Sequence, residues 1–118
     1  MGIGVDIEDI ERFREFDLDN AELKKIFTEN ELRYCFSRAV PAQHLAVRYS
    51  GKEAIIKALA SLGRAGLDYR DIEITNDNHG VPVARIIREG FGGYNILLSL
   101  SHSKTMAVAF SLVNQRES

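Results

Sequence analysis

A carboxylate and a lysine in the stretch GKEAIIKAL are the first candidates for chemistry in this sequence. Glu53 and Lys57 are four residues apart, so on a helix they share one face. The simplest interpretation is a solvent-exposed ion pair that stabilises the helix by a few tenths of a kcal/mol. However, the residues around the pair are small, which leaves room for another backbone or a ligand. These residues are Ala46, Ser50, Gly51, Ala54 and Ala60.

A second carboxylate, Asp6, lies in the opening stretch GIGVDIEDI. The apolar residues of this stretch alternate along one face: Ile3, Val5 and Ile7. This alternation predicts a strand whose apolar face belongs to the core, while Gly2 and Gly4 leave space beside Asp6 for something bulky. Asp6 could instead cap the following helix. Together with Glu53 it would suit Mg²⁺, which prefers one or two carboxylates completed by water and substrate phosphate.

The turn in LSLSHSKT is the third candidate. Its donors occupy five consecutive positions: Ser101, His102, Ser103, Lys104 and Thr105. Such a cluster suits a phosphate group. The simpler interpretation is turn chemistry alone, in which His102 only continues the apolar strand face of Leu98 and Leu100.

These candidates need elements that can position them. We expect an opening strand within residues 2–10 and helical segments over 8–16, 17–27, 28–38 and 42–63. Thr28 and Glu31 have the spacing of a capping box. Two hairpins are expected over 71–87 and 94–113. Helices followed by antiparallel strands predict an α+β fold, with residues 1–118 as one domain and 114–118 as a frayed tail.

Composition limits the class of protein. A chain of 118 residues with 45% hydrophobic content fills one core, although at this size oligomerisation would help to bury surface. A net charge of −2 argues against a general nucleic-acid binder. The single cysteine, Cys35, is expected in the core, and it excludes an internal disulfide and a cysteine zinc cage. With no apolar run of about 20 residues and no signal peptide, we expect a cytoplasmic protein.

Four stretches in order resemble the holo-acyl-carrier-protein synthase family of phosphopantetheinyl transferases. GIGVDIEDIERF resembles that family's opening Gly-Ile-Gly-x-Asp-Ile motif, and RYSGKEAIIKAL resembles its central Lys-Glu-Ala-x-x-Lys-Ala helix. DIEITNDNHGVPV resembles its Asn-x-x-Gly-x-Pro hairpin, and LSLSHSKTMAVAF its Ser-His-[Ser/Thr] turn. Each motif is weak alone, but the ordered set covers nearly the whole chain and is specific.

The resemblance implies a reaction. Members of the family move 4′-phosphopantetheine from coenzyme A to a serine of an apo acyl carrier protein and release adenosine 3′,5′-bisphosphate. They use Mg²⁺, and the short members are homotrimers with active sites between neighbouring subunits. Whether the carrier serves fatty-acid or polyketide synthesis is not encoded in one sequence.

Carried over to this sequence, the resemblance implies that Asp6 and Glu53 bind Mg²⁺. It places Lys57 near the pyrophosphate and makes these three residues the catalytic set. The attack on a phosphoanhydride also needs a base for the serine proton, which could be Glu53, a metal-bound water or Lys57. The sequence leaves these three alternatives open.

The resemblance also implies binding roles. His102, with Ser101 or Ser103, corresponds to the turn that contacts the phosphates of coenzyme A. Arg48 aligns with a basic residue that binds the nucleotide, although it projects well off the helix face that carries the carboxylate. Arg12 corresponds to a position that faces the carrier protein.

Two stretches depart from the family pattern. Ser50 and Gly51 replace two alanines, so the helix is expected to bend or to be crowded there, and SLGRAGLDY differs from the family's longer glycine-rich segment. These departures motivate a first alternative, a domain that binds coenzyme A or a carrier protein without turnover. A second alternative is a Mg²⁺-dependent phosphohydrolase with the same carboxylates and lysine.

Overall fold

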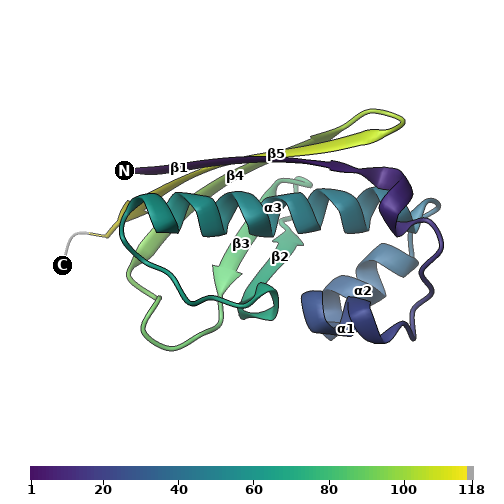
Figure 1. Ribbon diagram of the computed structural model, residues 1–118, viewed down its shortest axis with the longest axis horizontal. Coiled ribbons are helices and arrows are strands. Elements are labelled where there is room, and N and C mark those ends of the chain that lie inside the picture. Colours follow the sequence, from purple (N-terminus) through teal and green to yellow (C-terminus); the bar gives the residue numbers. More distant parts are fainter. Residues whose placement is uncertain (117–118) are drawn as a thin grey trace.

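The chain forms a strand, a group of helices and then two hairpins, in a computed structural model that describes residues 1–116 (Figure 1). In order, the elements are β1 (Gly2–Asp9), the 3₁₀ helix η1 (Ile10–Phe13), α1 (Ala21–Ile26), α2 (Glu29–Phe36), α3 (Pro41–Ser61), the 3₁₀ helix η2 (Tyr69–Asp71), β2 (Ile72–Asn76), β3 (Pro82–Ile86), β4 (Tyr94–His102) and β5 (Met106–Gln115). The predicted α+β class is confirmed. None of the helices described is long and apolar enough to cross a membrane.

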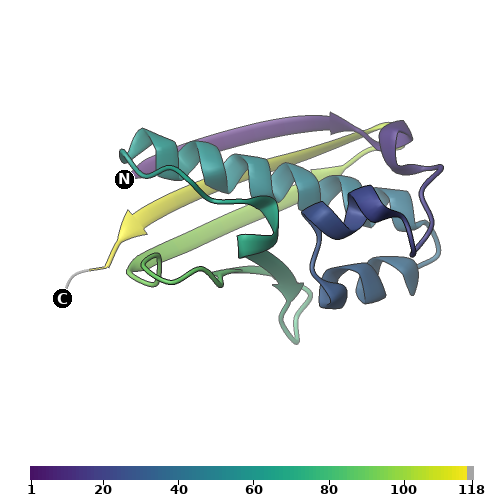
Figure 2. The same cartoon turned by 60° about the horizontal axis from the view of Figure 1, so that its bottom comes forward.

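The strands form two antiparallel sheets. The larger has the order β1-β5-β4, and the smaller pairs β2 with β3. Figure 1 shows α3 lying along one face of the larger sheet, while its other face carries no element. Figure 2 shows α1 and α2 gathered beside the first half of α3, so α3 is the centre of the molecule.

The burial of β1 is opposite to the prediction. Its alternating apolar residues, expected in the core, are more than half exposed: Ile3 (57%), Val5 (55%) and Ile7 (60%). The glycine face is the buried one, and it packs against the backbone of α3. A Cβ atom on Gly4 would lie 1.8 Å from the carbonyl oxygen of Ala54, and one on Gly2 would lie 2.2 Å from that of Ala58. The two glycines therefore make room for a helix and not for a ligand.

The bare side of the larger sheet is an apolar surface, which we call the outer sheet face. Val5 pairs with Phe110, and Ile7 pairs with Val108 on the adjacent strand. The exposed apolar residues of this face are Ile3, Val5, Ile7, Leu97, Val108 and Phe110. Contiguous apolar side chains on one face of a soluble domain indicate a surface that associates with something.

Several local predictions are confirmed. Thr28 and Glu31 form the predicted capping box at the start of α2, and Cys35 is fully buried. The helix expected over 8–16 is shorter, because β1 continues to Asp9 and only the single turn of η1 follows. Of the tail expected over 114–118, the first two residues belong to β5, and residues 117–118 lie outside the described residues.

The departure at Gly51 has a packing reason. A Cβ atom there would lie 2.7 Å from the side chain of Ile74 and 3.2 Å from that of Leu100. The helix is crowded at this position, as expected, because α3 contacts both sheets here.

A buried ion pair joins α3 to the helices beside it. Nζ of Lys52 lies 2.6 Å from Oε1 of Glu31, and both side chains are fully buried. The same ammonium group donates to the carbonyl oxygens of Ile26 (2.8 Å) and Tyr69 (2.9 Å). Burial lowers the pKa of Lys52, and the Glu31 carboxylate opposes that effect. Three acceptors surround the charge, so its hydrogen-bonding capacity is satisfied.

Candidate active site

Asp6 and Lys57 are brought together by the close packing of β1 on α3. Nζ of Lys57 donates to Oδ1 of Asp6 at 3.2 Å and to the carbonyl oxygen of Val5 at 3.1 Å. Since Gly4 has no side chain, the strand can approach the helix closely enough for this contact. Within the described residues Lys57 pairs with Asp6 and not with Glu53, so the simple helix-surface ion pair does not form.

Asp6 keeps one oxygen free. Its side chain is 12% exposed, and its Oδ2 atom is buried without a hydrogen-bond partner. An unpaired carboxylate oxygen in such a place is unfavourable unless a ligand completes it. A hard cation such as Mg²⁺ is the ligand that fits an oxygen-only donor set.

Glu8 shows that the carboxylates share one region. It follows Asp6 on the same face of β1 and accepts a hydrogen bond from Arg12 at 3.4 Å. Burial raises the pKa of Glu8, and the negative charges of Asp6 and Glu53 raise it further. Arg12 opposes these effects, and Lys57 pairs with Asp6, so two cations lie among the carboxylates. No group of three or more histidine, cysteine or acidic side chains that could hold a metal ion is found in residues 1–116.

Tyr69 contacts Glu53 directly. Its hydroxyl group donates to Oε1 of Glu53, and it lies 3.4 Å from the hydroxyl group of Tyr49. The hydrogen bond to Glu53 raises the pKa of Tyr69, as do the contact with Tyr49 and partial burial, so the hydroxyl keeps its proton. The sequence gives no signal for Tyr69, since the single 3₁₀ turn of η2 that carries it has no apolar period or motif to mark it.

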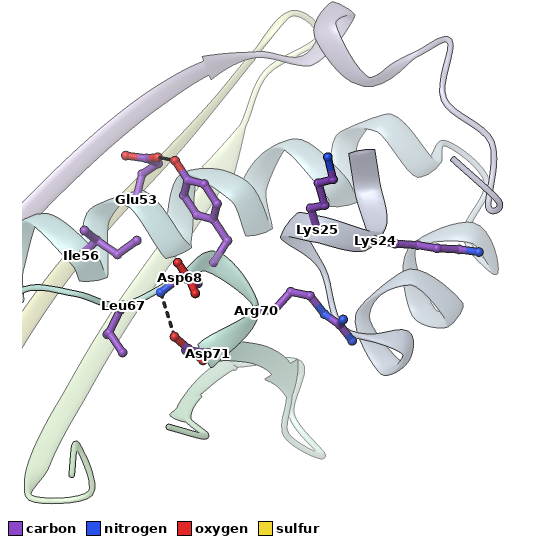
Figure 3. A pocket seen from close by; sticks show the side chains of 9 residues that line it. Lys24, Lys25, Glu53, Ile56, Leu67, Asp68, Arg70 and Asp71 are labelled. Carbon is purple, nitrogen blue, oxygen red and sulfur yellow. Dashed lines mark hydrogen bonds between the residues drawn. The ribbon is translucent and has the colours of Figure 1, made fainter. Parts of the chain in front are cut away.

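A pocket of about 560 Å³ opens beside Glu53 (Figure 3). Glu53 and Ile56 of α3 form one wall, with Leu67 below them. Lys24, Lys25 and Arg70 carry cations on another side, as Figure 3 shows. Asp68 and Asp71 line the pocket as well, so it combines apolar walls with cations and carboxylates in equal number.

Of the residues predicted to bind phosphates, Arg48 and His102 lie apart from the carboxylates, in a second group around Arg48. Arg48 is only 3% exposed, its guanidinium group lies 4.5 Å from the ring centroid of Tyr34, and its Nε atom is buried without a partner. His44 is close to this group. Burial lowers the pKa of His44, and the positive charges of Arg48, Arg38 and His102 add to the effect. Arg48, Arg38 and His44 thus gather around the ring of Tyr34, at 4.5, 5.5 and 5.7 Å from its centroid, which puts two guanidinium groups where an anion could be held.

The serines of the predicted phosphate turn do not point together. His102 pairs with Ala107 and so shares the inner face of the sheet, whereas Ser101 pairs with Val108 on the outer sheet face. The hydroxyl oxygen of Ser103 accepts from the amides of Thr105 (3.3 Å) and Met106 (3.1 Å). Ser103 therefore has the turn-forming contacts of the simpler interpretation.

The two groups do not meet within one chain. Ala107 lies between Glu8 on β1 and His102 on β4, so these residues are two strands apart, roughly 10 Å. Arg48 packs against α2, while Glu53 faces η2. No hydrogen bond or ion pair joins the two groups in the part of the chain described, and Arg48 projects away from the carboxylate as expected.

Arg12 lies on the surface beside the carboxylates. Its side chain is half exposed, and it pairs with Glu8. Its guanidinium group also lies 4.8 Å from the ring centroid of Tyr49. It is thus positioned to meet an acidic partner that approaches the site.

Known proteins resemble this chain in sequence and in fold. Residues 2–110 match the family model described as the 4′-phosphopantetheinyl transferase superfamily. The chain is 38% identical to the holo-[acyl-carrier-protein] synthase of Protochlamydia amoebophila, over 95% of this chain and 96% of that protein. It is 42% identical to the enzyme of the same name from Thermodesulfovibrio yellowstonii, again over 95% and 96%. It also resembles the crystal structure of a holo-(acyl-carrier-protein) synthase from Bacillus anthracis in complex with CoA (3′,5′-ADP), with a TM-score of 0.79 and 30% identity over 98% of this chain and 96% of that one. The chain therefore belongs to the 4′-phosphopantetheinyl transferase superfamily, and within it to the holo-[acyl-carrier-protein] synthases.

Proposed function

We propose that the chain transfers 4′-phosphopantetheine from coenzyme A to a serine hydroxyl of an apo acyl carrier protein, with Mg²⁺ as cofactor and adenosine 3′,5′-bisphosphate as the other product. Family membership and the coenzyme A complex of the Bacillus anthracis relative support this proposal. The observation that carries it is Asp6, a buried carboxylate held by Lys57 at one oxygen and unpaired at the other.

Asp6 and Glu53 would hold the metal ion. When bound, Mg²⁺ supplies charge neutralisation and polarisation at the pyrophosphate. The bond that forms joins the serine oxygen to the phosphorus that carries pantetheine, and the bond that breaks is the phosphoanhydride. Lys57, 53% exposed and adjacent to Asp6, is placed to stabilise the charge that develops on the departing phosphate.

Arg48 and His102 are the proposed contacts to the phosphates of coenzyme A. Arg48 has an unpaired buried nitrogen, and His102 is exposed at the end of β4. Ser103 contributes through the turn that it stabilises. Ser101 stays a predicted contact. Because it lies on the outer sheet face, it could reach only a ligand that is bound at the proposed interface with a neighbouring subunit.

A homotrimer with active sites between subunits accounts for two features of the single chain. The outer sheet face is apolar and exposed, so another copy can bury it. The phosphate-binding group and the carboxylates are separate in one chain, so an adjacent copy can supply the missing half. Mixing inactive Glu53→Gln and Arg48→Ala subunits should therefore restore measurable transfer, and a mixture that stays inactive would contradict shared sites.

The carrier protein is proposed to dock at Arg12. Lys24, Lys25 and Arg70 would add cations on the pocket side of Glu53, although Asp68 and Asp71 lie among them, so the docking proposal depends mainly on Arg12. The free, buried thiol of Cys35 fits a reducing compartment, so we place the reaction in the cytoplasm.

The decisive assay combines the protein, coenzyme A, Mg²⁺ and an apo carrier, and weighs the carrier by mass spectrometry. We expect the gain of one phosphopantetheine unit, and its loss when Mg²⁺ is chelated or when Glu53 is replaced by glutamine. No gain with any of several carriers would overturn the proposal. Phosphate release without carrier modification would instead support the phosphohydrolase alternative.

A further inference from the structure

Tyr69 is held at both ends by neighbouring residues of α3. Its backbone carbonyl oxygen accepts from Nζ of Lys52 at 2.9 Å, and its hydroxyl group donates to Oε1 of Glu53. Successive helix residues point about 100° apart, so Lys52 enters the core while Glu53 faces the pocket. Tyr69 therefore joins the buried Lys52 to the pocket-facing Glu53.

The backbone end of Tyr69 is fixed by the buried core. Lys52 is fully buried and bound to Glu31 at 2.6 Å. Glu31 in turn accepts from the amides of Thr28 (2.9 Å) and Ile74 (2.8 Å), which belong to the start of α2 and to β2. This satisfied network leaves the Tyr69 backbone little freedom to move.

The two candidate metal ligands have matching arrangements. Oδ1 of Asp6 is held by Lys57, and Oδ2 is unpaired. Oε1 of Glu53 is held by Tyr69, and no donor from the described residues contacts Oε2. In each carboxylate the protein holds one oxygen and leaves the other available to a cation.

We infer that Tyr69 is a positioning residue for the metal site, which orients the Glu53 carboxylate through its hydroxyl group so that Oε2 is presented to Mg²⁺. This inference rests on the metal site of the proposed function. Hydrogen-bond partners of metal ligands fix ligand orientation, and their removal typically weakens metal affinity by about 10–100-fold.

Tyr49 provides a matched control. Its ring packs against that of Tyr69 with centroids 5.3 Å apart, and its hydroxyl group lies 3.4 Å from the Tyr69 hydroxyl. Tyr49→Phe therefore removes a hydroxyl from the same aromatic contact without removing the donor to Glu53. Tyr69→Phe removes that donor and keeps the ring.

The experiment measures Mn²⁺ binding by electron paramagnetic resonance, with coenzyme A present and no carrier, so that no turnover occurs. Mn²⁺ is a suitable probe because it takes oxygen ligands as Mg²⁺ does. We expect Tyr69→Phe to bind Mn²⁺ about tenfold more weakly than the unchanged protein, and Tyr49→Phe to bind it equally well. Transfer assays should show a matching rise in the Mg²⁺ concentration for half-maximal rate, with the rate largely recovered at high Mg²⁺.

Each outcome separates this inference from the function on which it rests. Unchanged or tighter Mn²⁺ binding by Tyr69→Phe would overturn the inference, as would an equal loss in Tyr49→Phe. A lowered melting temperature without a change in Mn²⁺ affinity would assign Tyr69 a purely structural role. If the protein without substitutions transfers phosphopantetheine but binds no Mn²⁺, the metal site is overturned and this inference with it. If that protein transfers no phosphopantetheine, the proposed function itself is overturned.

Discussion

Replacing Gly4 by alanine tests whether the glycine face of β1 serves the helix or a ligand. A Cβ atom would lie 1.8 Å from the backbone oxygen of Ala54, whereas real Cβ contacts stay beyond 3.0 Å, so strand and helix must part by at least 1.2 Å. The obstacle is backbone inside a helix, which cannot rotate away as a side chain would.

Two effects follow from that displacement. Overpacking of this kind typically costs 1–3 kcal/mol, and because backbone must move we expect about 3 kcal/mol of unfolding free energy, or roughly 10 °C in melting temperature. The same movement separates Asp6 from Lys57, which are 3.2 Å apart in the intact protein. A misplacement of about 1 Å at a catalytic group lowers kcat/KM by about 100-fold, and we expect that loss even where the variant is fully folded.

The assay compares Gly4→Ala with Gly92→Ala, since a Cβ atom on Gly92 meets nothing within 4 Å and its φ is not positive. Urea unfolding followed by circular dichroism, at equal protein concentration, gives the stability of each variant. Phosphopantetheine transfer is then measured where both are folded. If Gly4→Ala kept its unfolding midpoint and only raised KM for coenzyme A, the glycine would serve a ligand and our assignment would be wrong.

Three further predictions follow from the surface and the core. Val5→Lys places a charge on the outer sheet face, and we expect it to convert the proposed assembly to monomers, as measured by analytical ultracentrifugation, with loss of transfer. The control Ile87→Lys, at another exposed apolar position, should leave the mass unchanged. An unchanged mass for Val5→Lys would contradict the proposed interface. Arg12→Glu should raise KM for the carrier at least tenfold and leave coenzyme A affinity intact, so a parallel loss of both would argue against docking there. Burial raises the pKa of Cys35 from 9.0 to about 12, so the thiol stays protonated in the folded chain while the unfolded chain loses the proton above pH 9. The free energy of unfolding should therefore fall as pH rises from 9 toward 12, and Cys35 contributes at most about 4 kcal/mol to this fall. The Cys35→Ala variant should lack that contribution. Identical pH profiles of stability for the two proteins would refute this prediction.

The sequence predicts which residues of β1 share a face, but it does not predict which face is covered. Alternation predicts that Ile3 and Val5 share one face of the strand and that Gly4 and Asp6 share the other, and both pairs do so in the structure. Burial depends on what packs against each side. Here a helix rich in small residues needs the glycine side to approach closely, so the apolar side is left for another surface. Hydrophobicity alone assigns the core to the wrong face because it does not say which element packs against each side.

The proximity of the candidate site residues was predictable only as far as local spacing determines it. Asp6, Glu53 and Lys57 lie in two segments whose packing brings them into one region, and the capping box at Thr28 forms as its spacing indicates. The contacts of Tyr69 were not predictable, because they join residues 16 or 17 positions apart through a loop. Pairings of this kind depend on the path of the chain between the partners, which no periodicity records.

The geometry of α3 supports the proposal that the site is shared between subunits. Arg48 and Glu53 are five residues apart on one helix, so their side chains point about 140° apart. Gly51 and Ala54, on the sheet-facing side of the helix, are in contact with the sheets. A ligand that touches both Arg48 and Glu53 of one chain would therefore have to pass around α3, a path that the proposed site between subunits would avoid. If the proposed interface is correct, assembly and catalysis depend on the same packing, and a charge at Val5 should abolish transfer although Val5 has no side-chain contact with either group.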